Sequence, residues 1–210
     1  MHATVPASTV EGRVAAPPSK SYTHRAIFAG AYGSGCEIHR PLLSADTRAS
    51  IRQLMEETLE RLEQLPSVER AAVGLGLPFQ RPLNLGMQIQ LPDGTMTQTA
   101  VSTIYVTPGY FETLRVPLLR GRDLTEQDGP EAAPVMVVNR AFVDRYMGGD
   151  VELGRRVGSS GAEREIVGVV GNVLQDPSGV GGTDDPLAHI PMVYLPAAQV
   201  DDSAYVLIRA

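Results

Sequence analysis

Beyond Pro66 the sequence is a series of short apolar runs separated by turn-forming residues, and this pattern restricts the fold more than any other feature. Asp93-Gly94 lies between the runs Met87–Leu91 and Thr95–Val106, and an Asp-Gly pair between strand-like runs is typical of a β-hairpin. Further strands are expected at Val135–Val138, Glu165–Val173 and Met192–Leu195, and another apolar run covers Val68–Val73. The sequence therefore predicts mixed β-sheets.

Short helices are predicted among these strands. Pro108–Leu114 starts with a proline, which is favoured in the first turn of a helix, and Arg140–Met147 is followed by Gly148-Gly149. Ser159-Ser160, flanked by glycines, is expected at a hairpin tip. The chain has no internal repeat and no sustained heptad, so the predicted class is α+β, with mixed sheets and short helices.

The N-terminal part predicts a short βαβα segment ahead of that body. We expect a strand at residues 8–14, a helix from Ser21 to Ala31 and a strand at residues 36–40. A second helix, capped by Asp46, is predicted to run to about Gln64, because apolar residues recur at helical spacing until just before Pro66.

Lys20 is the only lysine in a chain with 18 basic residues. An ammonium group is a compact point charge that approaches an anion from any side, whereas a guanidinium forks in a plane. Ser21 adds a hydroxyl at a helix start, and Arg25 adds a bidentate donor. Lys20, Ser21 and Arg25 are therefore the candidate binding site for a phosphate or carboxylate; the alternative is a solvated helix start.

The residues around Lys20 carry a family resemblance. SKSYTHRA at 19–26 followed by PLLSADT at 41–47 resembles the N-terminus of enolpyruvylshikimate phosphate (EPSP) synthase, the 3-phosphoshikimate 1-carboxyvinyltransferase, over about residues 1–52. The resemblance implies that Lys20, Ser21 and Arg25 contact phosphoenolpyruvate and shikimate 3-phosphate. Most of that enzyme has no counterpart here, so the site is expected to be vestigial.

The rest of the chain resembles a different family. Its segments are MEETLERLEQLPSVERAAVGLGLPF at 55–79, YVTPGYFETLRVPLLRGRDLTEQD at 105–128, APVMVVNRAFVDRYMGGDVELGRRV at 133–157, REIVGVVGNV at 164–173 and PMVYLPAAQ at 191–199. In this order they are similar to the MacB-like periplasmic core domain of ABC transporter permeases. We therefore expect a fusion of two domains, a synthase-like fragment at 1–52 and an incomplete periplasmic core domain at 53–210.

Charge changes at the same boundary. Residues 1–52 carry six basic and three acidic side chains, a net of +3, which leaves twelve basic and 21 acidic ones, a net of −9, for the remainder. An acidic body with 5% aromatic residues argues against nucleic-acid binding, which needs basic surface and stacking rings. No run approaches the roughly 20 apolar residues of a membrane helix, and the N-terminus does not have the pattern of a secretory signal.

Motifs that would make the body an enzyme are missing. No lysine follows residue 20, which excludes a phosphate-binding P-loop there, and no GxSxG or HExxH spacing occurs. Neither a metal nor a cofactor is expected. The cluster Gly74-Leu-Gly76 is interpreted as a turn, and Gly168 and Gly171 as positions of close strand packing.

These observations predict a non-catalytic extracytoplasmic-type domain of an efflux or lipoprotein-handling transporter. It would act through protein partners and transmit motion, with the hairpin at Asp93-Gly94 and the loop at 176–189 as contact edges. The family resemblance implies a periplasmic or extracytoplasmic location. Two alternatives stay open: a truncated or divergent carboxyvinyltransferase, and a small-anion binding module that uses Lys20.

Overall fold

The computed structural model describes residues 53, 56–74, 82–150, 153–159, 161–176 and 189–199. The chain forms two compact units, one of residues 1–51 with 207–210 and one of residues 52–206, and all of the described residues belong to the second. The predicted βαβα segment and its site residues Lys20, Ser21 and Arg25 therefore lie outside the described residues.

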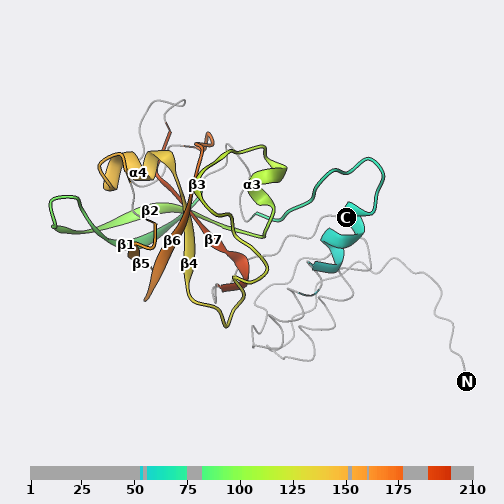
Figure 1. The fold of residues 1–210 in the computed structure, drawn as a ribbon, viewed down its shortest axis with the longest axis horizontal. Helices are drawn as coiled ribbons and strands as arrows, with labels where there is room; N and C mark the ends of the chain where they lie inside the picture. The colour runs from blue at the N-terminus through green and yellow to red at the C-terminus, as the bar shows by residue number, and fades with distance from the viewer. Residues whose placement is uncertain are drawn as a thin grey trace, which may run out of the picture. The chain divides into compact units, whose positions relative to one another are not determined.

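The described unit is a mixed β-structure with short helices (Figure 1). Its strands are β1 (Leu83–Gln90), β2 (Met96–Val106), β3 (Leu118–Gly121), β4 (Val135–Asn139), β5 (Arg156–Ser159), β6 (Ala162–Val170) and β7 (Met192–Pro196). The helices are α3 (Tyr110–Thr113), α4 (Arg140–Tyr146) and the 3₁₀ turn η1 (Ala197–Gln199), and residues 56–63 are also helical.

The sheet closes on itself. Its strand order is β3-β6-β4-β7-β2-β1-β5, and β5 also pairs with β6, so that all strands except β3 form a six-stranded barrel. The pairs β2–β7 and β4–β6 are parallel and the others antiparallel. Closure depends on β6, whose first residues pair with β5 and whose last residues pair with β3 on the same edge.

Two apolar layers follow from the alternation of side chains along these strands. Inside the barrel, residues such as Met136, Ile166 and Leu195 are 0–1% exposed, and α4 adds Phe142 and Val143 to the same cluster. The outward faces of β2, β4 and β7 form the second cluster, which α3 covers with Tyr110 and Phe111. The rings of Phe111 and Tyr194 meet edge to face at 4.8 Å.

Most of the predicted elements are confirmed within the described residues. The hairpin, the two short helices and the strands β4 and β7 lie where the patterns placed them, and the helix ending before Pro66 stops at residue 63. The strand predicted at Glu165–Val173 instead runs from Ala162 to Val170. Strands β3 and β5 were not predicted, because neither of their sequences, LLRG and RVGS, is a continuous apolar run.

The apolar run at 68–73 forms no strand, contrary to the pattern. At its end the run makes hydrogen bonds to one residue instead of a strand ladder: Val73 N donates to Thr107 Oγ1, and Thr107 N donates to Val73 O. Gly74, expected in a turn, forms an isolated bridge with Val106. A Cβ atom at Gly74 would lie 2.4 Å from the Tyr110 ring, so the position needs glycine for close packing.

Gly168 allows the close strand approach that the sequence indicated. A Cβ atom there would lie 2.2 Å from the backbone oxygen of Arg122, and one at Gly171 would lie 3.0 Å from the Pro117 ring. The segment that contains β3 therefore packs directly on the β6 backbone.

Candidate interaction surface

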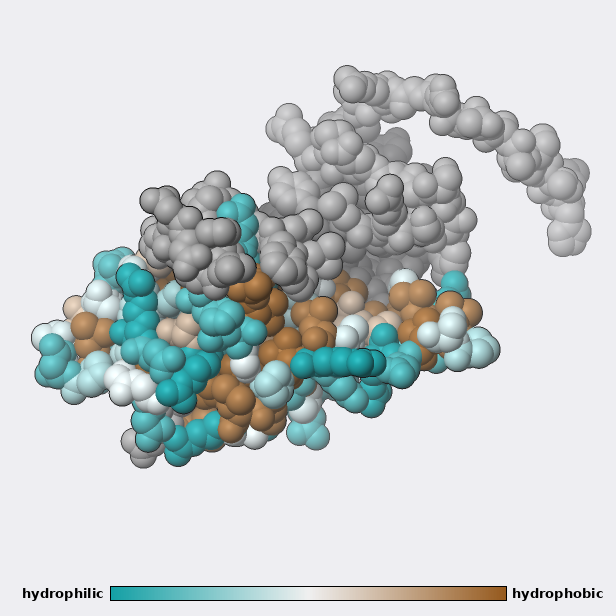
Figure 2. Space-filling view, turned by 90° about the horizontal axis from the view of Figure 1, so that it is seen from above, coloured by the Kyte–Doolittle hydropathy of each residue, from teal (hydrophilic) through white to brown (hydrophobic). Residues whose placement is uncertain are grey.

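The β1–β2 hairpin is the most prominent exposed feature of the described unit and was predicted as a contact edge. It extends away from the barrel to the left in Figure 1. Its strands pair from Leu83↔Thr103 out to Gln90↔Met96, and the Met96 side chain is 65% exposed. In the perpendicular view of Figure 2, hydrophilic and apolar residues are interspersed at this end of the molecule.

The tip of this hairpin is held in one conformation by local bonds. Leu91 N donates to Thr95 O at 2.7 Å, and Gly94 has φ +85, which suits a three-residue hairpin loop. Asp93 accepts hydrogen bonds from Thr95 N at 2.9 Å and Thr95 Oγ1 at 2.6 Å. These bonds, that from the hydroxyl first, lower the pKa of Asp93, so the tip presents an ordered negative charge.

An open cleft lies beside the base of this tip. Its volume is about 560 Å³, and its lining residues are Gln90, Leu91, Pro92, Gly94, Leu153, Gly154 and Arg155. The Arg155 guanidinium donates to the backbone oxygen of Gln90, and Pro92 lies against Gly148. The hairpin is thus braced against the segments that follow α4, as a rigid contact element needs to be.

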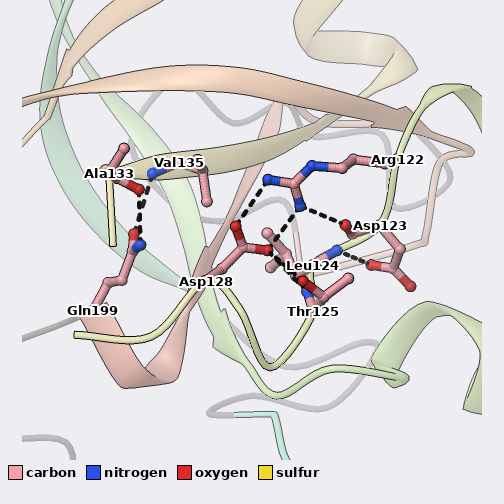
Figure 3. Close-up of polar contacts among 8 residues, drawn as sticks. All are labelled: Arg122, Asp123, Leu124, Thr125, Asp128, Ala133, Val135 and Gln199. Atoms are coloured by element: carbon pink, nitrogen blue, oxygen red, sulfur yellow. Dashed lines mark hydrogen bonds and ion pairs between the residues drawn. The ribbon is translucent and has the colours of Figure 1, made fainter. Parts of the chain in front are cut away.

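A second polar cluster orders the loop between β3 and β4 (Figure 3). Asp128, whose side chain is 6% exposed, accepts from both terminal nitrogens of Arg122 at 2.8 Å and from Thr125 N at 2.8 Å. The hydrogen bond from Arg122 is the main cause that lowers the pKa of Asp128. Burial raises the pKa of the neighbouring Asp123. These contacts fix the loop in one conformation.

Gln199 joins the end of that loop to the barrel. Its Nε2 donates to Ala133 O at 2.9 Å, and its Oε1 accepts from Val135 N at 3.1 Å (Figure 3). The same Oε1 accepts from Arg164 Nη1 at 3.1 Å. Sequence reasoning missed Asp128, Gln199 and Arg164, because isolated polar residues in a loop or strand carry no motif.

The other predicted features are only partly placed. Of the loop at 176–189, only its two end residues are described. Within the described ranges, no group of three or more His, Cys, Asp and Glu side chains lies close enough together to hold a metal ion. No helix in the described part of the chain has both the length and the apolar character needed to cross a membrane.

Comparison with known families decides what this unit is. A family model for the MacB-like periplasmic core domain matches residues 18–210. The chain belongs to this family. The matched range starts ahead of the boundary expected at residue 53, so the division between the periplasmic core domain and the synthase-like fragment stays a prediction.

Solved structures with some likeness to the chain include other transporter domains. One is the extracellular domain of the noncanonic ABC-type transporter YknZ from Gram-positive bacteria, with a TM-score of 0.48, 14% identity and coverage of 73% of this chain and 67% of that one. Another is the periplasmic region of MacB from Actinobacillus actinomycetemcomitans, with a TM-score of 0.45, 17% identity and coverage of 69% and 56%. Membership in the MacB-like family rests on the family model.

The curated relatives match a short part of the chain and belong to the other resemblance. The 3-phosphoshikimate 1-carboxyvinyltransferase of Natronomonas pharaonis is 62% identical over 52 residues, which are 25% of this chain and 12% of the relative. That of Methanosarcina mazei is 60% identical over 52 residues, with the same coverage. The chain thus spans about an eighth of the length of these synthases, and the partial likeness to EPSP synthase is confirmed.

Proposed function

We propose that this chain is a non-catalytic extracytoplasmic domain of an ABC transporter permease of the efflux or lipoprotein-handling type. It binds protein partners and passes on motion that an ATPase elsewhere generates. The observation that carries the proposal is the family match over residues 18–210. A closed barrel with a packed interior suits this role, because a rigid body transmits a displacement without deforming.

The β1–β2 hairpin is the proposed contact element. It combines an ordered tip with an exposed apolar side chain, Met96, and an open cleft at its base. Loops fixed on a rigid scaffold often carry recognition. A preordered loop also loses less conformational entropy on binding, which favours affinity.

Site-specific cross-linking in cells tests this surface. A photo-reactive amino acid at Met96, which is 65% exposed, is compared with one at Leu119 on β3, which is 51% exposed. We expect one dominant product from the Met96 position, containing an extracytoplasmic protein of the same transporter, and little of it from Leu119. Equal products from both positions would contradict the role of the hairpin.

ATP turnover gives an independent test of the non-catalytic assignment. No lysine follows residue 20, so the body cannot supply the lysine of a P-loop. The purified chain should not hydrolyse ATP above the level of a mock preparation. Turnover that copurifies with the chain through successive columns would remove the proposal.

The 52-residue likeness to the synthases favours a second candidate, weak anion binding at Lys20, Ser21 and Arg25. Because the match covers 12% of the synthase, we propose no carboxyvinyl transfer by these residues, and phosphate affinity no tighter than millimolar, about 4 kcal/mol. Calorimetry with shikimate 3-phosphate, on the parent chain and Lys20→Ala, measures it. Turnover of phosphoenolpyruvate with shikimate 3-phosphate, abolished by Lys20→Ala, would make the chain an enzyme.

A further inference from the structure

Arg164 occupies the end of the barrel opposite α4. It lies on β6 with the inward-facing Ile166, and it is 7% exposed. Glu165 N donates to Pro134 O, which places this part of β6 beside the start of β4. Helix α4 begins where β4 ends, at Asn139. A guanidinium therefore lies at one end of the barrel interior, and the buried side chains of α4, Phe142 and Val143, lie at the other.

The contacts of Arg164 are all to neutral acceptors. Nη1 donates to Gln199 Oε1 at 3.1 Å, Nη2 lies 3.5 Å from Gln199 O, and Nε has no partner. No ion pair within the described part of the chain involves it. Arg122, by contrast, places both terminal nitrogens on the carboxylate of Asp128.

Among the described residues, this buried cation has no ion-pair partner. An arginine stays protonated in proteins, and a buried charge is costly unless an opposite charge or a full set of hydrogen bonds compensates it. Burial lowers the pKa of Arg164, which is the direction expected for a cation held away from water. The Gln199 oxygens accept from Nη1 at 3.1 Å and from Nη2 at 3.5 Å. Nε has no partner, and Nη2 keeps a second hydrogen on the same edge as Nε.

A second donor without an acceptor lies on the same inner surface. Ser159 is 2% exposed and its Oγ has no partner. Strands β5 and β6 pair with Val157 opposite Arg164 and Ser159 opposite Ala162. Ser159 and Arg164 are therefore diagonal neighbours on one face of the hairpin, with Cα atoms roughly 7–8 Å apart by sheet geometry.

We propose that this end of the barrel binds a single carboxylate, held side-on by Nε and Nη2 of Arg164, with the Ser159 hydroxyl as a further donor. A planar carboxylate matches the two parallel N–H groups of a guanidinium edge. The carboxylate is that of a free small acid, for which acetate is the probe.

NMR of arginine Nε–Hε groups tests the proposal on the full chain, with sodium acetate replacing sodium chloride at constant ionic strength and neutral pH. We expect the Arg164 Hε signal to shift and saturate at millimolar acetate. The Arg122 signal, whose guanidinium already holds Asp128, is the internal control and should not move. Ser159→Ala should weaken binding about 3- to 10-fold through the loss of one hydrogen bond.

A saturable Arg164 shift in the parent chain that is weakened in Ser159→Ala supports a carboxylate site at Arg164. The absence of a saturable Arg164 shift in the parent chain, or an equal shift at Arg122, overturns the proposal.

Discussion

Asp128→Asn removes one negative charge from the loop between β3 and β4 with almost no change in volume. The carboxylate accepts four hydrogen bonds, two from Arg122 at 2.8 Å and two from Thr125, from its N at 2.8 Å and its Oγ1 at 3.3 Å. An asparagine amide accepts through one oxygen only. Its NH₂ group would face the donors of Arg122 or Thr125, so the substitution both removes attraction and opposes donor to donor.

The expected cost follows from burial on the two sides of the pair. A hydrogen bond to a charged group contributes about 1.5–3 kcal/mol to stability, and breaking a fully buried ion pair costs about 3–5 kcal/mol. The Arg122 side chain is 48% exposed, so water rehydrates part of the freed guanidinium. We therefore expect a loss of about 2–3 kcal/mol, which lowers the Tm of a domain this size by about 4–12 °C.

The effect should depend on pH in a fixed direction. The pKa of Asp128 is lowered in the folded state, so its contribution to stability is present above the unfolded pKa of about 4 and is lost as pH falls through the folded value. Burial raises the pKa of Asp123, which acts with the opposite sign. The difference between the parent and Asp128→Asn removes the part of that background that comes from burial, but not the part that comes from the charge of Asp128.

Urea unfolding between pH 2 and 7 measures this difference. The matched control is Asp144→Asn, because Arg140 Nε lies 2.8 Å from Asp144 but both side chains are about half exposed, 51% and 52%. An exposed pair of this kind contributes less than about 0.5 kcal/mol. If the two variants lose equal stability, or if the loss in Asp128→Asn does not shrink at low pH, the assigned role of the buried carboxylate is wrong.

Substitutions at three buried positions, with Gly86→Ala as a control, test the packing and the buried hydrogen bonds by thermal melting. Ile166→Asp places a charge at a position that is 0% exposed and should cost more than about 4 kcal/mol; a Tm equal to that of the parent would contradict the assigned barrel interior. Gly168→Ala should cost about 1–3 kcal/mol, because its Cβ meets the Arg122 oxygen at 2.2 Å. Gly86→Ala, with nothing within 4 Å, should be neutral or stabilising, and similar losses in both would refute the close contact. Asn139→Ala removes a fully buried side chain that donates to Ile190 O and accepts from Phe142 N and Met192 N, and should cost about 2–4 kcal/mol; a Tm equal to that of the parent would contradict these contacts.

Much of the described fold was predictable from short stretches of sequence. The hairpin followed from Asp93-Gly94 between two alternating runs, and α4 from an apolar pattern that ends at Gly148-Gly149. These features depend on residues close in the chain, where backbone preference and side-chain period act directly. The family was also evident from ordered motifs, and the family model confirms it.

The candidate site was predictable only in part. The hairpin tip was predicted from its turn residues. The structure adds the Asp93–Thr95 hydrogen bonds, the Arg155 contact that braces the hairpin, and the cleft beside the tip. Lys20 was named from its chemistry alone and stays a prediction. The run at 68–73 shows the limit of the method, because its apolar residues fit a strand but its backbone bonds to Thr107 instead.

The sequence by itself determined the alternation of strands and short helices, the hairpin and the family. Only the tertiary structure decided that the sheet closes into a barrel, since closure needs β1 to pair with β5 across some 70 residues. It also decided the surroundings of Arg164, whose partner Gln199 is 35 positions away. The physical reason is that burial and pairing are properties of residues that meet in space, while sequence patterns record only neighbours along the chain.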